Sequence, residues 1–157
     1  MKKTGILLFN FLFILLLSCD KDRDDFDNNF ILLEMQTDEN LDYENPEFEI
    51  SLYGHNDTIA DTGANLITSQ NFSAKEFPFI IRMDIPANPY AKIENLEENS
   101  NARFYITIQW DSDNNGQNCA GDIDLDENVQ DVELINIDRR DAQDIFLHTI
   151  SETTPCD

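Results

Sequence analysis

The chain has 157 residues, of which 32 are acidic and 10 are basic, and its formal net charge at pH 7 is −22. A nucleic acid needs basic patches that replace its counterions, and this surface would repel both that polyanion and a bare anionic bilayer. The composition therefore excludes nucleic acid as a partner and suits cations, basic partners or simple solubility.

The N-terminus has the three regions of a secretory signal. Lys2 and Lys3 precede an apolar run of twelve residues, Ile6 to Leu17, that only Asn10 interrupts. A membrane-spanning helix is the alternative, but it would need about twenty apolar residues, and this run is followed at once by charged ones. We therefore predict that residues 1–18 are a signal peptide that is removed.

The end of this signal, Leu16-Leu17-Ser18-Cys19, resembles the lipobox of bacterial lipoproteins. The resemblance implies a diacylglyceryl thioether on Cys19, cleavage before it, and acylation of the new amino group by a fatty acid such as palmitate. Two or three acyl chains hold a protein on a membrane almost permanently. The mature chain, with 8 basic and 32 acidic residues, is thus expected to be lipid-anchored in the cell envelope, at the outer membrane, periplasmic or surface-exposed.

Residues 20–29 form a polar segment between Cys19 and the first apolar run. They include five aspartates and one aromatic residue, a composition that buries too little apolar surface to order itself. We predict an acidic tether over residues 19–29. The segment also resembles the surface-export tag of some Gram-negative lipoproteins, and a plain charged linker is the alternative.

From Phe30 onward, short apolar runs separated by polar turn residues favour strands over helices. One helical turn is expected within Pro89–Glu98, where apolar residues recur every three positions. In Arg103–Trp110, Phe104, Ile106 and Ile108 should form the buried face. The predicted strands are Phe30–Met35, Glu47–Tyr53, Asn65–Phe72, Phe77–Ile85, Arg103–Trp110, Val132–Asp138 and Ile145–Ile150.

These elements predict one all-β domain over residues 30–157. Short strands with frequent turn signals and no internal repeat or linker are typical of a two-sheet β-sandwich, of immunoglobulin-like or transthyretin-like kind. A small barrel is the alternative.

A candidate calcium loop follows Trp110. Asp111-Ser112-Asp113-Asn114-Asn115-Gly116 has oxygen ligands at positions 1, 3 and 5 and glycine at position 6. The flanking strands, Cys119 at position 9 and aspartate rather than glutamate at position 12 exclude an EF-hand. An ordinary solvated turn has a similar composition and is the alternative. The predicted ligands are Asp111, Asp113, Asn115, Gln117 and Asp122.

No catalytic motif is recognisable in the sequence. Asp122, Asp124 and Asp126 would share one side of an extended segment, where they either stay solvated or share a cation. His55 and His148 have no acid or cysteine at metal-ligand spacing. Because no nucleophile elbow, zinc motif or phosphate loop occurs, we predict a protein that is not an enzyme.

The cysteines form an even pair once Cys19 is lipidated. In an oxidising, exported setting, Cys119 and Cys156 are expected to form a disulfide bond that fastens the C-terminal tail to a loop. Two unpaired thiols are the alternative.

The middle of the chain resembles the YbaY/YscW-like lipoprotein domain, a family related to chaperone-like lipoproteins of type III secretion. The resemblance implies a compact β-sandwich and no catalytic residues. The chain differs from that family in the acidic segment Asp111–Glu127 and in Cys156. The residues that carry the resemblance are Ile50-Ser51-Leu52, Asp57 to Ala64, Ile67, Gln70, Phe77-Pro78-Phe79 and Tyr105-Ile106-Thr107-Ile108.

The Tyr105–Trp110 strand with its following loop also resembles transthyretin-like envelope domains. Together these features predict a non-enzymatic, membrane-anchored module that binds a protein or a glycan, with calcium ordering the loop. A chaperone-like or pilot accessory of a secretion or envelope assembly system, acting through an exposed strand edge, is the alternative.

Overall fold

The computed structural model describes residues 29–59, 63–97, 101–129 and 135–151. Within these residues the chain forms strands and one short 3₁₀ helix. The elements are β1 (Phe30–Gln36), β2 (Glu47–Asn56), β3 (Asn65–Ser73), β4 (Phe79–Asp84), η1 (Pro89–Lys92), β5 (Ala102–Gln109), β6 (Ile123–Leu125) and β7 (Gln143–Thr149).

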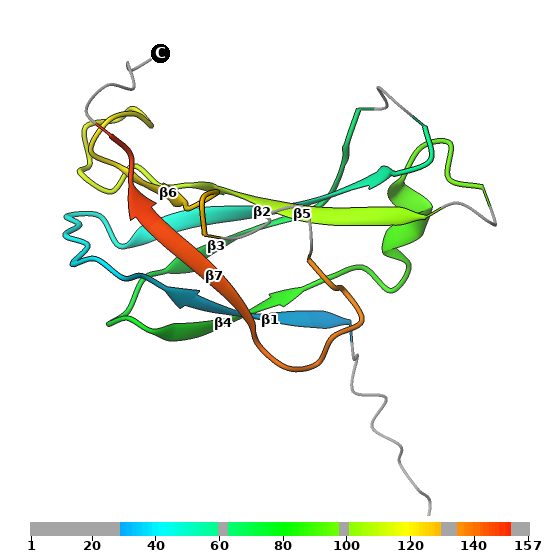
Figure 1. Cartoon of the computed structure of the whole chain (residues 1–157), viewed down its shortest axis with the longest axis horizontal. Helices are drawn as coiled ribbons and strands as arrows, with labels where there is room; N and C mark the ends of the chain where they lie inside the picture. The colour runs from blue at the N-terminus through cyan, green and yellow to red at the C-terminus, as the bar shows by residue number, and fades with distance from the viewer. Residues whose placement is uncertain (1–28, 60–62, 98–100, 130–134, 152–157) are drawn as a thin grey trace, which may run out of the picture.

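The strands form two sheets packed face to face, which confirms the predicted β-sandwich. The four-stranded sheet has the order β4-β1-β7-β6, and the three-stranded sheet has the order β3-β2-β5. All described pairings are antiparallel except that of β1 with β7. Figure 1 shows β2, β3 and β5 as one layer and β1 and β4 as the other, with β7 running obliquely from β1 toward β6.

Alternation of apolar and polar residues builds the core between the sheets. In β1, Ile31, Leu33 and Met35 point inward and are fully buried. Their register partners in β4 are Met83, Ile81 and Phe79, which are buried too. Because opposite residues in an antiparallel pair share a face, the two strands present one apolar surface. The buried face predicted for Phe104, Ile106 and Ile108 is confirmed.

Most predicted strands match observed ones to within three residues at each end, β6 was not predicted, and two of the differences have a clear physical cause. The strand expected over Phe77–Ile85 begins at Phe79, because Pro78 has no N–H to donate to a sheet. Val132–Asp138 is not a strand over its described part, residues 135–138. There Asn136 begins a turn, accepting the N–H of Arg139 at 3.2 Å, while Ile135 and Ile137 are buried. Their burial, and not a sheet, explains the irregular apolar pattern.

The helical turn expected in Pro89–Glu98 is η1. The side chain of Asn88 caps it by accepting the N–H of Ala91. It lies between β4 of one sheet and β5 of the other, so it is the crossover between the layers.

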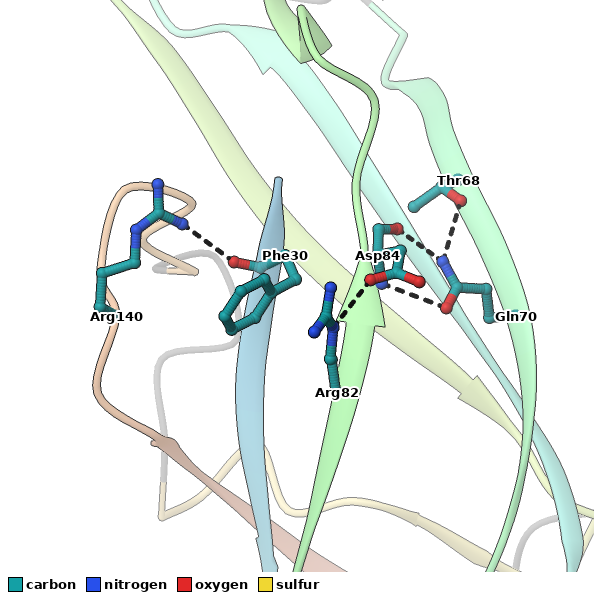
Figure 2. A network of polar contacts seen from close by, with 6 residues as sticks. All are labelled: Phe30, Thr68, Gln70, Arg82, Asp84 and Arg140. Atoms are coloured by element: carbon teal, nitrogen blue, oxygen red, sulfur yellow. Dashed lines mark hydrogen bonds and ion pairs between the residues drawn. The ribbon is translucent and has the colours of Figure 1, made fainter. Parts of the chain in front are cut away.

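The two sheets are also joined at one edge of the sandwich, where β3 and β4 are terminal strands. The side chain of Gln70 in β3 donates to the carbonyl of Asp84 in β4 and accepts the Asp84 N–H at 3.2 Å. Figure 2 shows this clasp beside Phe30, whose ring lies 4.0 Å from the Arg82 guanidinium and whose carbonyl accepts a hydrogen bond from Arg140. Side chains thus occupy backbone groups that an open edge would leave free.

Candidate functional site

The segment that follows β5 is anchored to the segment that precedes β2. Trp110 is fully buried, its ring stacks on Phe48 with centroids 4.8 Å apart, and its Nε1 donates to the carbonyl of Asn45 at 2.7 Å. The Asn45 side chain in turn donates to the carbonyl of Asp111 at 3.0 Å. This double link fixes where the chain leaves the sheet.

We call residues Asp111–Asp122 the acidic loop. Its first turn is organised by Asp111, whose carboxylate accepts the N–H groups of Asn115 and Gly116, each at 2.9 Å. Asn114 and Gly116 have positive φ angles of 58° and 86°, a conformation that asparagine and glycine tolerate best. The first turn therefore forms from local interactions, because the Asp111 carboxylate accepts backbone N–H groups in place of a backbone carbonyl.

Asp122 closes the loop from inside the protein. Its side chain is 0 % exposed. One carboxylate oxygen accepts the Ser112 N–H at 2.6 Å, the Ser112 hydroxyl at 3.2 Å and the Asp113 N–H at 3.4 Å, and the other accepts the Cys119 N–H at 2.9 Å. A buried carboxylate is stable only with such donors.

The structure brings three of the five predicted calcium ligands together. Ligand oxygens of Asp111, Asp113 and Asp122 all lie within 4.8 Å of one another. The Asn115 side chain donates to Asp113 at 2.7 Å and its oxygen accepts the Gln117 N–H at 2.8 Å, so it belongs to the same turn. Hard carboxylate oxygens at this spacing fit a calcium ion in chemistry, and Asp111, Asp113 and Asp122 are the residues that could hold one.

The segment after the loop is not the solvated acidic edge that the sequence suggested. Ile123 and Leu125 are buried as expected. However, Asp122 is fully buried, and the Asp126 side chain is only 14 % exposed, with its carboxylate 3.8 Å from Nδ1 of His148. The alternative in which all three carboxylates stay solvated is wrong, because the segment pairs with β7 and covers the core.

Asp124 lies opposite His148 in this pairing. Burial raises the pKa of the Asp124 carboxyl, the N–H of Leu125 and the nearby His148 lower it, and Glu127 raises it. The net effect is a raised pKa, so burial is the dominant cause.

A groove of about 590 Å³ lies where the acidic loop meets the three-stranded sheet. Five of its eleven lining residues carry side-chain amides, namely Asn45, Asn71, Gln109, Gln117 and Asn118. Glu49 in β2 has Asn71 of β3 and Gln109 of β5 as its register partners. Since Glu49 alternates with buried Phe48 and Ile50, these three side chains stand on the outer face of the sheet in one row.

This row is the part of the groove that sequence reasoning missed. The alternation in β2 and β5 does place Glu49 and Gln109 on outward faces. It cannot show that they are neighbours, because β2 and β5 are far apart in the sequence and their register is set by tertiary pairing. Asn71 lies in a segment with a weak strand pattern.

The remaining predicted site residues are not brought to this groove. Cys119 is buried in the acidic loop, whereas Cys19 and Cys156 lie outside the described residues, so lipidation and the disulfide stay predictions. His55 and His148 are half-buried strand residues of different sheets. Among the residues that the structure describes, no helix has the length and apolar character needed to span a membrane.

Comparison with known proteins gives one match. No family model matches the chain, so the YbaY/YscW-like resemblance stays a prediction, and no curated protein matches it. Among solved structures, the chain is similar to an alternative pilotin from the type II secretion system of Vibrio cholerae, with 12 % identity and a TM-score of 0.44. The likeness covers 77 % of this chain and 96 % of the pilotin.

Proposed function

We propose that this chain is a lipid-anchored envelope lipoprotein whose β-sandwich acts by binding a partner and not by catalysis. The observation that carries the proposal is the groove between the acidic loop and the outer face of the three-stranded sheet. Its polar side chains stand on a rigid sheet, and a rigid scaffold holds a binding surface at little cost in conformational entropy.

The groove also has groups free to bind. The side chains of Glu47, Asn71 and Gln109 make no hydrogen bond or ion pair with another described residue. They are solvated in the free protein, and a partner could replace that water with direct hydrogen bonds.

Binding without turnover can be tested with the mature chain in detergent micelles. The chain is incubated with envelope extract, and the captured material is identified and its mass is compared with that of the same material before contact. We expect capture of intact material that is lost in the variant Asn71→Trp, which fills the groove. Capture unaffected by that variant, or recovery of cleaved or modified material, would contradict the proposal.

The anchor is tested separately. Metabolic labelling with a palmitate analogue should label the wild-type chain and not the variant Cys19→Ala, and the variant should no longer fractionate with membranes. The matched control is Cys156→Ala, which leaves the lipobox intact. Equal labelling of wild type and Cys19→Ala would overturn the lipid anchor.

We also propose that calcium orders the acidic loop through Asp111, Asp113 and Asp122, with Asn115 and the Gln117 carbonyl as further ligands. The three clustered carboxylates support this. A ligand that binds only the folded protein raises its stability. A melting temperature that rises in millimolar calcium, and rises less in Asp113→Ala, is the expected result. The same melting temperature in calcium and in chelator would contradict calcium binding.

A second candidate function is that of a pilot or chaperone-like accessory that holds an extended segment of another envelope protein. One edge of β5 supports it: a groove of about 270 Å³ runs along Tyr105–Ile108 toward Asp124, Leu125 and Glu127. A photocrosslinker at Glu127, which lines this second groove, should capture the partner if this candidate is right, and one at Asn71 should capture it if the first is right.

A further inference from the structure

The side chains of the amide-rich groove indicate which class of partner it binds. This inference rests on the proposed binding function. Acidic residues are spread over the whole chain, so the carboxylates of Glu47, Glu49 and Asp111 do not set the groove apart. The side-chain amides are what distinguish the groove from the rest of the surface. A side-chain amide offers two N–H donors and an acceptor oxygen, and the hydroxyl group that it would meet is likewise both a donor and an acceptor.

The outer face of the three-stranded sheet continues this polar surface away from the loop. Two residues along from Glu49, the register row is Ser69, Ser51 and Thr107. Ser51 is buried and its hydroxyl donates to the Glu49 carboxylate at 3.5 Å, so Ser69 and Thr107 are the hydroxyl groups that this row offers to a ligand. Neighbouring strands lie about 4.8 Å apart, and alternate residues of one strand lie about 6.8 Å apart. The amide row and the hydroxyl row therefore form a polar patch about 10 Å wide.

A row of two tyrosines and a leucine closes this patch. Tyr53 has Leu66 and Tyr105 as its register partners, and the two tyrosine rings stack with centroids 5.4 Å apart. Leu66 is 49 % exposed. The patch thus changes from amides through hydroxyls to apolar side chains along one direction, which matches a ligand with many hydroxyl groups and some C–H surface.

Charge decides between ligands that carry hydroxyl groups. The lining residues of the groove include Glu47, Glu49 and Asp111 and no basic residue, so an anionic polysaccharide would be repelled. We propose that the row Asn71–Glu49–Gln109 and the groove beside it bind an uncharged glycan, with the amides and Glu49 hydrogen-bonded to its hydroxyl groups.

The test uses the mature chain in detergent micelles and an array of neutral hexasaccharides of glucose, mannose and xylose, with heparin hexasaccharide as the anionic arm. We expect binding to at least one neutral glycan and none to heparin. Titration calorimetry of that glycan should show affinity lowered about fivefold to tenfold in Asn71→Ala and in Gln109→Ala, since each change removes one or two ligand hydrogen bonds. Asn40→Ala, an exposed asparagine outside the groove, is the matched control and should bind as wild type does.

Salt and a basic peptide separate the glycan from a cationic partner. Binding of an uncharged ligand should change little between low and high salt, because no ion pair is screened. The inference is overturned if no neutral glycan on the array binds, if heparin alone binds, if both alanine variants bind as wild type does, or if a lysine-rich peptide displaces the glycan at low salt only. Groove-dependent capture of a protein from the extract, without glycan binding, would overturn the glycan and leave the binding function standing.

Discussion

The carboxylate of Asp122 and the backbone N–H of Ser112 form a hydrogen bond of 2.6 Å across the base of the acidic loop. Both residues are buried, at 0 % and 1 % exposure. The bond ties the first turn of the loop to the residue before β6, so the loop is held by its own ends rather than by a ligand alone.

Replacing Asp122 by alanine should therefore destabilise the fold. The change leaves the buried N–H groups of Ser112 and Cys119 without an acceptor. Because the lost acceptor is charged, the free energy of unfolding should fall by about 3 kcal/mol or more. The free energy of unfolding from urea titration measures the loss. Asp113→Ala, at an exposed position of the same loop, is the control and should cost less than about 1 kcal/mol in chelator. Equal effects of the two changes would contradict the bracing role of Asp122.

Gly54 should tolerate a methyl group only if its neighbour shrinks. A Cβ atom at this position would lie 2.9 Å from Cδ1 of Ile93 and 3.0 Å from the ring of Phe104. We expect Gly54→Ala to cost about 1–3 kcal/mol through overpacking and Ile93→Val to cost about 0.5–1.5 kcal/mol alone.

The double variant provides the decisive comparison, because Ile93→Val removes the Cδ1 atom that the methyl group introduced by Gly54→Ala would meet. Its free energy of unfolding, followed through the fluorescence of the single tryptophan, Trp110, should fall by less than the sum of the two single losses. Additivity within about 0.5 kcal/mol would show that the two positions are not in contact.

The clasp between Gln70 and Asp84 should hold two sheet edges together. Gln70→Ala removes both of its hydrogen bonds to the Asp84 backbone (Figure 2), and their exposed position limits the cost to about 1 kcal/mol. Hydrogen exchange of the Asp84 amide should become faster. Gln70→Glu keeps an acceptor for that amide and should exchange more slowly than the alanine variant; the same rate in both would argue against the clasp.

Asp124 should make stability depend on pH. Folding raises the pKa of this carboxyl above its ordinary value of 3.8, so the folded protein binds this proton more tightly than the unfolded chain does. The contribution of Asp124 to stability is then fully present below its ordinary pKa and is lost as the pH rises through the raised value.

The variant Asp124→Asn removes this charge and keeps an oxygen that can accept the Leu125 N–H. We expect its free energy of unfolding to exceed that of the wild type at pH 7, with the difference vanishing near pH 3. Asp38→Asn, which removes one exposed charge, controls for the lowered net charge. A gain at pH 7 that the control reproduces in full would assign the effect to general repulsion.

The disulfide between Cys119 and Cys156 remains a prediction that thiol titration can settle. Denatured mature protein should show no free thiol before reduction and two after it. The bond would close a long loop, and its reduction should lower the free energy of unfolding by about 2–4 kcal/mol. Two thiols found without reduction would refute the pairing.

Much of the architecture follows from the sequence alone. Strict alternation in Arg103–Trp110 and the apolar residues of Phe30–Met35 predicted strands and their inward faces, because side chains of a strand alternate between two faces. The spacing of Asp111, Asp113 and Gly116 predicted a calcium loop, with an ordinary solvated turn as the alternative. The carboxylates organise the turn through hydrogen bonds that each span only a few residues. Sequence patterns therefore predict the features that depend on contacts between residues close together in the chain.

Strand register and the burial of polar residues depend on contacts between distant segments, so they became known only from the tertiary structure. No local pattern shows that Glu49 stands between Asn71 and Gln109, because strand register is set by which faces bury apolar surface across distant segments. Burial made Asp122 the internal brace of the acidic loop as well as a candidate calcium ligand. Burial also made residues 135–138 a core-filling turn instead of a strand. The sequence thus determined the alternation of each strand and the turn chemistry of the loop, whereas long-range pairing and burial determined which polar residues meet at the groove.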